Sequence, residues 1–277
     1  MIIAAPAMQT PTWCPPQSIF RICDPNCDFV EQVFASRTLC DQQGQEHKLD
    51  VFIPAEQGKL LYSVVRYLKP HRTLEVGLAN GVSALHIAKA LSDNSIGHHT
   101  AIDPFQSSDW NELGMTSLRR AGLAEWVSLD PRPSHAAIPN LESAGHQIQF
   151  AFIDGSHLLD YVMADFLGID RILAVGGMIA FDDSDWPSVT SVIRFAMTNR
   201  DYRVFDPGIV IEPSPGHPKS WLAWIRRRLR RSASLKRILR HDFLYPSHEL
   251  GINGRCVILQ KTSEDRRDNQ SRQLCDF

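Results

Sequence analysis

Apolar residues first recur at helical spacing between residues 54 and 68. Leu60, Leu61, Val64, Val65 and Leu68 lie three or four positions apart or side by side, and the pattern stops before Pro70. This spacing predicts an amphipathic helix that ends ahead of the proline. Five prolines interrupt the chain before residue 54, so the sequence there predicts only a short helix at 28–36.

Beyond Pro70 the chain alternates short apolar runs with amphipathic stretches. The apolar runs predict strands at 73–76, 100–103, 126–129, 149–153, 177–181, 203–205 and 256–260. The amphipathic stretches predict helices at 82–91, 111–121, 135–142, 158–173 and 189–197. Repeated βα units of this length indicate an α/β fold, a doubly wound and mostly parallel sheet of seven strands with helices on both faces. Ligands of such sheets bind beyond the carboxyl ends of the strands.

Three regions follow from this pattern. We predict an irregular N-terminal extension over 1–53, one α/β domain over 54–261 and a polar tail over 262–277. A basic, helical insert at 213–250 separates the last two strands of the domain.

The composition excludes several classes of protein. With 43% hydrophobic and 22% charged residues, the chain is not of the disordered type. No apolar run approaches the roughly 20 residues of a membrane span, and the first residues lack the basic start of a secretory signal. Six cysteines without a CxxC pair are too few for a disulfide scaffold at this length, so we expect reduced thiols and a cytoplasmic protein.

The net charge of −2 conceals one strongly basic segment. Nine Lys and Arg residues and no acid lie between residues 219 and 240, which leaves 20 basic against 31 acidic residues elsewhere. Trp221, Leu222, Ile225 and Leu229 share one helical face of the segment. Three interpretations stay open: a lid over a ligand pocket, a contact with an anionic membrane or substrate, and a solvated helix packed on the body. Nucleic-acid binding is disfavoured, because the acidic remainder would repel phosphates.

A glycine-containing turn joins the first predicted strand of the sheet to the next helix. It contains Glu75, Gly77, Asn80 and Gly81, and the second strand ends in Asp103, 26 residues after Gly77. Glycine permits a positive φ and a close approach of ligand to backbone, while a carboxylate at the second strand can accept hydrogen bonds from ribose hydroxyls. The alternative is a tight turn with a helix cap. Neither G-x-G-x-x-G nor a phosphate-binding P-loop is present, which disfavours a nicotinamide oxidoreductase.

Carboxylates follow the fourth and fifth strands. Asp154 ends one strand and the pair Asp182–Asp183 ends the next, so all three are expected at one edge of the sheet. Like charges repel unless a cation neutralises them, and oxygen ligands favour a hard ion such as Mg²⁺. Helix capping would explain one aspartate per helix but not the doubled one. His157, three residues after Asp154, could accept a proton or make only a local hydrogen bond.

The stretches LEVGLANGVSALHIAKAL and TAIDPF resemble the first two motifs of class I S-adenosylmethionine-dependent methyltransferases, which have a Rossmann-like fold. The resemblance implies that Gly77 and Gly81 flank the methionine part of the cofactor, with Asn80 in the same turn. It also implies that Glu75 helps to hold the amino group and that Asp103 binds the ribose.

Ser134, just past the third strand, falls where that family often places an adenine contact. The positions of Asp154, Asp182 and Asp183 are similar to the metal ligands of the cation-dependent O-methyltransferases, including the catechol, caffeoyl-CoA and macrolide-sugar types. The DGSH form most resembles the macrolide-sugar branch. From their positions we expect His157 and Asp154 to serve in catalysis. The resemblance covers residues 54–206, and the basic insert departs from it.

The resulting hypothesis is an S-adenosylmethionine-dependent methyltransferase that methylates a hydroxyl on a small molecule, glycosyl or phenolic, with the help of Mg²⁺. Methyl transfer from a sulfonium is an in-line displacement, so the enzyme must orient the acceptor and make its oxygen nucleophilic. Two alternatives stay open. One is a cofactor-binding scaffold of the same fold without catalysis, and the other is a nicotinamide-dependent oxidoreductase. The partner expected is a small molecule, with no nucleic acid, and a homo-oligomer is compatible with the sequence.

Overall fold

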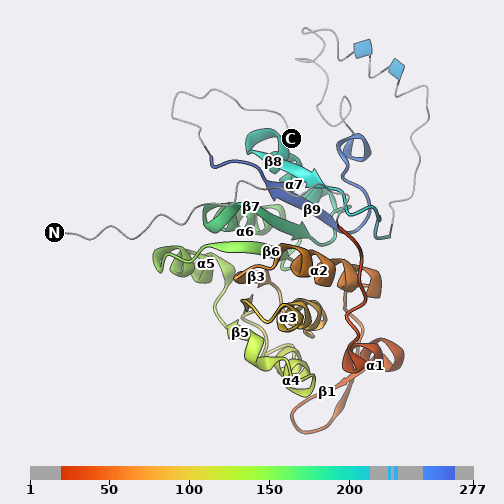
Figure 1. The fold of residues 1–277 in the computed structure, drawn as a ribbon. Coiled ribbons are helices and arrows are strands. Elements are labelled where there is room, and N and C mark those ends of the chain that lie inside the picture. Colours follow the sequence, from red (N-terminus) through yellow and green to blue (C-terminus); the bar gives the residue numbers. More distant parts are fainter. Residues whose placement is uncertain (1–19, 213–223, 226–227, 230–245, 266–277) are drawn as a thin grey trace, which may run out of the picture.

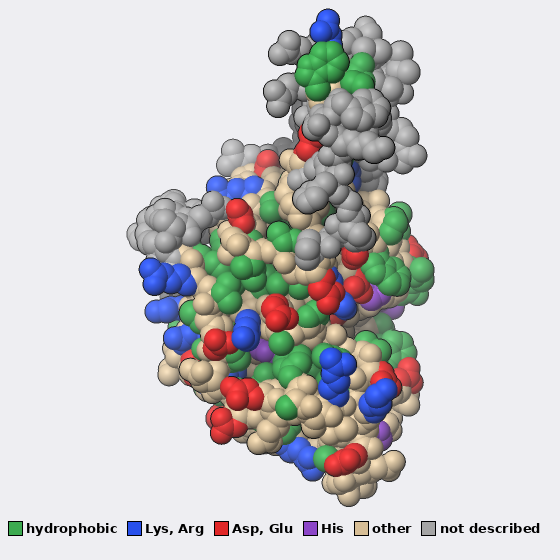
Figure 2. All heavy atoms as spheres, turned by 90° about the vertical axis from the view of Figure 1, so that its right-hand side faces the viewer, with side chains coloured by type: hydrophobic (Ala, Val, Ile, Leu, Met, Phe, Trp, Pro, Cys, Tyr) green, Lys and Arg blue, Asp and Glu red, His purple; other side chains and the backbone are tan. Residues whose placement is uncertain are grey.

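The computed structural model describes residues 20–212, 224–225, 228–229 and 246–265. Most of the basic segment at 219–240, including Trp221 and Leu222, lies outside the described residues, as do the ends of the chain with Cys14 and Cys275. Within the segment, the Trp224 side chain is 62% exposed and the Arg228 guanidinium carbon lies 5.7 Å from the centre of its ring. Figure 2 shows basic and acidic side chains interspersed over one face of the described body.

Seven strands form one sheet at the centre of the molecule (Figure 1). They are β3 (Arg72–Val76), β4 (His98–Ile102), β5 (Val127–Asp130), β6 (Ile148–Ile153), β7 (Leu173–Phe181), β8 (Tyr202–Phe205) and β9 (Val257–Lys261). Their order across the sheet is β5-β4-β3-β6-β7-β9-β8, and β9 alone among them runs antiparallel to its neighbours. The predicted seven-stranded, mostly parallel sheet is therefore confirmed.

Helices cover both faces of this sheet, as expected for a doubly wound fold. They are α2 (Ala55–Leu68), α3 (Val82–Asn94), α4 (Leu113–Arg120), α5 (Ser134–Ser143), α6 (Leu159–Ile172) and α7 (Pro187–Asn199). Successive side chains of β6 enter the hydrophobic cores on opposite faces of the sheet. Phe150 and Phe152 pack with α2 and α3, whereas Ala151 and Ile153 pack with α5, α6 and α7. Because β6 is buried on both sides, its sequence is a continuous apolar run.

The N-terminal extension contains more structure than the sequence predicted. The predicted helix is present as α1 (Asp28–Ser36), but β1 (Thr38–Cys40) and β2 (Glu46–Lys48) follow it as an antiparallel hairpin. Asp41 forms the turn of this hairpin, since its Oδ1 accepts from the amides of Gln43 and Gln45, both at 2.9 Å. Three-residue strands carry almost no periodic signal, so side-chain bonding in the turn, not hydropathy, defines this element.

The boundary between α6 and β7 also differs from the prediction. The strand begins at Leu173, four residues before the predicted start, and its pairing with β6 shifts register between Ile148 and Phe150. The glycines at 176 and 177 interrupt the apolar pattern that would have marked the beginning of this strand. No helix in the described part of the chain has both the length and the apolar character needed to cross a bilayer.

Substitution of Phe166 provides a test of the hydrophobic packing beneath α6. Its side chain is fully buried, and its ring lies 5.5 Å from that of Tyr202 and 6.3 Å from that of Phe181, measured between centroids. We expect Phe166→Ala to lower the free energy of unfolding by about 3–5 kcal/mol through lost burial and a cavity. Urea unfolding measures this loss. Leu159→Ala on the same helix removes a side chain that is 46% exposed and should cost less than about 0.5 kcal/mol; equal losses would contradict the packing.

Candidate active site

The carboxyl ends of the central strands meet along one edge of the sheet. The amides of Gly77, Asp154 and Asp182 each donate to the last carbonyl of the neighbouring strand, at 2.9, 2.9 and 3.0 Å. The chain connections also reverse direction between β3 and β6, a switch point at which open α/β sheets bind ligands. The residues predicted from the sequence to be functional therefore lie at the place where this fold puts its sites.

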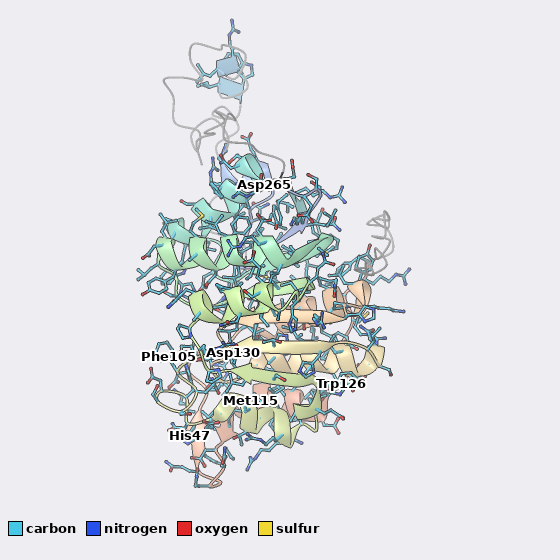
Figure 3. The ribbon with its side chains drawn as sticks, turned by 90° about the vertical axis from the view of Figure 1, so that its left-hand side faces the viewer. His47, Phe105, Met115, Trp126, Asp130 and Asp265 are labelled. Carbon is cyan, nitrogen blue, oxygen red and sulfur yellow. The ribbon has the colours of Figure 1, made fainter. Side chains whose placement is uncertain are left out.

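A cavity of about 440 Å³, called here the large cavity, opens over this edge. Three of the residues predicted to bind a cofactor, Gly77, Asp103 and Ser134, line it, together with Asp154 and the apolar surfaces of Phe105 and other aromatic residues. In Figure 3, Phe105 lies at the same edge as Asp130, the last residue of β5. The volume is within the range of pockets that bind small molecules and cofactors.

Gly77 allows the residues that follow β3 to lie close to the residues that follow β6. Its φ is +94°, and a Cβ at this position would lie 2.1 Å from the carbonyl oxygen of Asp154. Any other residue would push the end of β3 away from the end of β6. The glycine predicted to approach a cofactor thus also brings Asp154 against the floor of the large cavity.

Asp103 braces the turn that follows β3. Its Oδ2 accepts from the amides of Leu78 and Ala79 at 3.1 and 2.8 Å and from Gln106 Nε2 at 3.0 Å, while its Oδ1 accepts from the Phe105 amide at 2.8 Å. The residue is 3% exposed and lines the large cavity. Because Oδ1 has a single donor, it retains a lone pair for a ligand hydroxyl. The predicted ribose contact is compatible with this geometry and stays a prediction.

Glu75 and Asn80 are not among the residues that line the large cavity. The buried Glu75 carboxylate accepts from Ser83 Oγ at 2.7 Å, and its Oε1 lies 3.2 Å from His99 Nε2. The Asn80 side chain donates to the carbonyl of Val51 at 2.7 Å, which ties the segment after the β1–β2 hairpin to the glycine turn. The cofactor contacts expected of these two residues remain predictions.

Ser134 begins α5 at the wall of the large cavity. Its hydroxyl donates to Asp165, a carboxyl on α6 that lines the same cavity and is 3% exposed. Burial raises the pKa of Asp165 to about 6, and the Ser134 hydrogen bond only partly opposes this shift. Asp165 was not predicted as a site residue, although an acid among the apolar positions of a helix marks a buried polar group.

A second, small cavity of about 80 Å³ adjoins the first. Ala79 and Asp154 line both cavities, so the two spaces meet at the end of β6. Val51, Phe52 and Ile53 form part of its wall. The N-terminal extension therefore contributes directly to the site, which sequence periodicity did not predict.

The three predicted metal-binding aspartates line this small cavity. Asp154 and Asp182 lie close together here, and the side chain of Asp182 is only 2% exposed. Burial and the neighbouring Asp182 carboxylate raise the pKa of Asp154 well above its ordinary value. Negative charge is thus crowded at the ends of β6 and β7, as the sequence predicted.

His157 lies beside this cluster. Its Nε2 is 2.9 Å from Asp183 Oδ2 and 4.0 Å from Asp154 Oδ1, and its ring centroid is 4.9 Å from that of Trp186. The nearby Asp183 carboxylate raises the pKa of His157, and the imidazole in turn lowers the pKa of Asp183. His157 thus lies close to two of the carboxylates, and its role as a base stays a prediction.

Two further side chains donate to the cluster. Gln57 Nε2 donates to Asp182 Oδ1 at 2.8 Å, and Arg255 donates to both oxygens of Asp182 and lies 3.3 Å from Asp183 Oδ1. Among the described residues, no group of three or more His, Cys, Asp and Glu side chains is arranged as a metal site. The oxygen donors fit a hard cation in kind, but neighbouring side chains occupy those of Asp182 and Asp183 in this arrangement.

Gln57 and Arg255 escaped the sequence prediction for different reasons. Gln57 lies three and four positions before Leu60 and Leu61, on the buried face of α2, and a polar residue at such a position is a usable signal. Arg255 lies a hundred residues from Asp154, after the basic insert, and nothing local connects it to the site.

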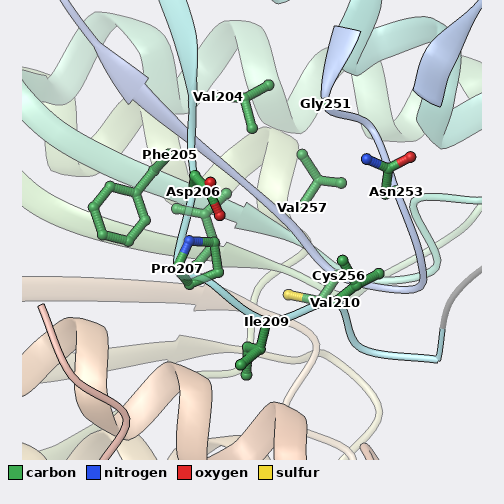
Figure 4. Close-up of a pocket in the computed structure, with 11 residues that line it drawn as sticks. Val204, Phe205, Asp206, Pro207, Ile209, Val210, Gly251, Asn253, Cys256 and Val257 are labelled. Carbon is green, nitrogen blue, oxygen red and sulfur yellow. The ribbon is translucent and has the colours of Figure 1, made fainter. Parts of the chain in front are cut away.

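A separate cavity of about 380 Å³ lies beside β8 and β9 (Figure 4). Its wall includes Phe205, Val210, Asn253 and Cys256 and contains none of the residues predicted for the site. Burial raises the pKa of the Cys256 thiol well above its ordinary value, so this cysteine stays protonated and unreactive at neutral pH.

Comparison with known proteins agrees with this geometry. Residues 74–184 match a family model described as a methyltransferase domain. That stretch holds the glycine turn, Asp103 and all three aspartates of the cluster. These residues are therefore similar to a methyltransferase domain.

Two plant enzymes are similar in sequence to about half of this chain. A caffeoyl-CoA O-methyltransferase of Populus kitakamiensis is 26% identical over 141 residues, which cover 48% of this chain and 55% of that enzyme. Another, of Stellaria longipes, is 30% identical over 132 residues, which cover 47% of this chain and 52% of that enzyme. The chain thus spans about half the length of these relatives.

Solved structures share the α/β fold of this chain. An O-methyltransferase from Bacillus cereus in complex with SAH has a TM-score of 0.51 at 19% identity, covering 68% of this chain and 86% of that one. An SAH-bound methyltransferase from Podospora anserina has a TM-score of 0.50 at 16% identity, covering 71% and 85%. At these identities the likeness concerns the fold alone.

The raised pKa of Asp165 makes the free energy of unfolding depend on pH. Because its pKa in the folded state is about 6, above the ordinary 3.8, the folded protein holds this proton more tightly than the unfolded chain. Stability from this residue is therefore present at low pH and lost as the pH rises from about 4 to about 6. Relative to wild type, Asp165→Asn should gain up to about 3 kcal/mol between pH 4 and pH 7. Urea unfolding across this range tests it, and a difference that does not change with pH would contradict it.

Proposed function

We propose that this protein transfers a methyl group from S-adenosylmethionine to a hydroxyl of a small molecule, glycosyl or phenolic, with the help of a divalent cation. The observation that carries the proposal is the meeting of two cavities at Asp154, with His157 and Asp183 beside the smaller one. One cavity has the size and lining of a cofactor site, and the other has the groups that a hydroxyl needs to lose its proton.

The cofactor is proposed to occupy the large cavity. Asp103 would accept hydrogen bonds from the ribose, and Ser134 lies where an adenine contact is expected, at the start of α5. Gly77 brings backbone against the floor, where the methionine part would lie. The SAH that the names of the structural neighbours mention supports this choice of ligand.

The acceptor is proposed to present its hydroxyl to the small cavity while its body stays outside. Val51, Leu158 and Trp186 are between 51% and 62% exposed, and each either lines that cavity or adjoins His157. Exposed apolar side chains around a polar site favour an acceptor with an apolar or ring-shaped body. The likeness to caffeoyl-CoA O-methyltransferases supports a phenolic hydroxyl.

In the proposed reaction the acceptor oxygen attacks the methyl carbon as the carbon–sulfur bond breaks. The acceptor proton passes to the His157 ring, whose Nε2 lies close to Asp154 and Asp183. Asp183 stabilises the resulting imidazolium, because its carboxylate lies 2.9 Å from that nitrogen. Asp154, shared by both cavities, orients the acceptor at the point where they meet.

Asp154, Asp182 and Asp183 are the proposed ligands of the cation. A bound divalent cation such as Mg²⁺ would lower the pKa of an acceptor hydroxyl. Carboxylate oxygens are the ligands this kind of ion prefers, and three of them gather at the small cavity. A reducing, cytoplasmic compartment belongs to the proposal, since the cysteines at 23, 27, 40 and 256 are free.

Calorimetric titration of S-adenosylmethionine tests the cofactor site. We expect Asp103→Asn to weaken binding at least about tenfold, because it removes a charged acceptor and places an N–H donor against the turn. Asp130→Asn is the matched control: Asp130 ends the adjacent strand and pairs with Arg132, but it lines neither cavity. Equal affinities for wild type and Asp103→Asn would remove the ribose contact, and no binding by wild type would overturn the methyltransferase proposal.

His157→Gln tests the proton transfer. We expect kcat for methylation of a catechol-type acceptor to fall about 10²–10⁴-fold, while the affinity for S-adenosylmethionine stays unchanged. His146→Gln, in the loop before β6, serves as the control and should leave kcat unchanged. A cofactor-binding scaffold without catalysis would instead give no turnover in wild type, and a small change in kcat for His157→Gln would exclude the base.

A further inference from the structure

Arg255 is held firmly in place at the edge of the small cavity. Its amide donates to the carbonyl of Ile211 at 2.8 Å, and its own carbonyl accepts from the Ser184 amide at 2.8 Å. The preceding Gly254 has a φ of +74°, and a Cβ there would lie 2.2 Å from the Ile211 carbonyl oxygen. The sharp turn at Gly254 and two backbone hydrogen bonds thus direct the Arg255 side chain toward the carboxylates.

The guanidinium bridges the two aspartates that end β7. Arg255 Nε lies 3.2 Å from Asp182 Oδ1 and 3.3 Å from Asp183 Oδ1, and Nη2 lies 3.4 Å from Asp182 Oδ2. Arginine presents its donors in a rigid fork that suits carboxylates, and its charge is permanent. A fixed positive charge therefore already neutralises part of the cluster.

Every carboxylate oxygen of this pair has a donor nearby. Gln57 completes the surroundings of Asp182 Oδ1 at 2.8 Å, and His157 lies 2.9 Å from Asp183 Oδ2. A hard cation binds directly to such lone pairs, and it repels a guanidinium that contacts the same oxygens. A cation and Arg255 therefore compete for Asp182 and Asp183.

A second acid offers the guanidinium an alternative partner on the outside. Arg255 Nη1 lies 3.6 Å from Glu212 Oε2, whose side chain is 59% exposed, whereas that of Arg255 is 28% exposed. The side chain can thus leave the cluster without losing all its acidic contacts.

We propose that Arg255 is a built-in counter-cation of the carboxylate cluster, and that it and a divalent cation are alternative partners of Asp182 and Asp183. Arg255 is a positioning residue: it keeps the acidic pair in place without a metal ion, and it sets how much cation is needed to fill the site. The inference rests on the cation-assisted function proposed above and adds the residue that controls the cation affinity.

The test is Mn²⁺ binding to the full chain without S-adenosylmethionine or acceptor, followed by electron paramagnetic resonance of free Mn²⁺. We expect Arg255→Gln to bind Mn²⁺ at least about tenfold more tightly than wild type, because a repelling charge and a competitor for the oxygens are gone. Arg255→Lys keeps the charge, so its affinity should stay within about threefold of wild type. Near-ultraviolet circular dichroism checks that each variant is folded.

Arg171→Gln is the matched control. Arg171 also donates through Nε to a carboxylate, Glu142, at 2.8 Å, but it lies at the opposite end of α6 from the site. Its Mn²⁺ affinity should equal that of wild type.

Equal or weaker Mn²⁺ binding by Arg255→Gln, or no binding by any variant, would overturn the inference. If Arg255→Gln fails to fold, the Mn²⁺ affinity of Arg255→Lys still tests the inference. An affinity more than about tenfold above that of wild type would contradict a role of the positive charge, because lysine keeps that charge. Failure of the proposed function is separate: it would be seen as no binding of S-adenosylmethionine by wild type, whatever the Mn²⁺ affinities.

Discussion

Electrostatic repulsion among three carboxylates at the ends of two parallel strands is the constraint on which the site depends. Asp154 and Asp182 lie close enough to interact electrostatically, and Asp183 follows Asp182 directly. Parallel pairing of β6 and β7 in register makes this proximity unavoidable, because the two strands end at the same level. Burial and this repulsion raise the pKa of Asp154, while a guanidinium beside Asp182 and Asp183 and an imidazole beside Asp183 offset the negative charge.

The segments that supply these partners come from distant parts of the chain. Gln57 comes from the first turn of α2, His157 from the loop after β6, and Arg255 from the turn before the antiparallel strand β9. The same edge carries Gly77 and Asp103, which shape the large cavity. One edge of the sheet therefore combines a cofactor-sized space with a group of charges that can accept a proton, and the cavities meet at Asp154. This combination, more than any single residue, supports methyl transfer.

Much of the fold was predictable because its local signals agree with one another. The continuous apolar run of β6 and the helical spacing in α2 and α6 each specify one element, and short connections between them leave few topologies. The β1–β2 hairpin and the early start of β7 were not predictable. Three-residue strands give no usable period, and the glycines at 176 and 177 interrupt the apolar run of β7.

The sequence by itself determined the α/β architecture, the glycine turn after β3 and the placement of Asp103, Asp154 and Asp182 at the strand ends. These features depend on residues close together in the chain and on the rule that parallel strands end at one edge. Only the tertiary structure decided that Glu75 and Asn80 bond to Ser83 and Val51 without lining the large cavity, that Ser134 lies by Asp165, and that Arg255 reaches the carboxylates. The direction of a side chain depends on the packing of segments tens to hundreds of residues apart, which no local pattern records.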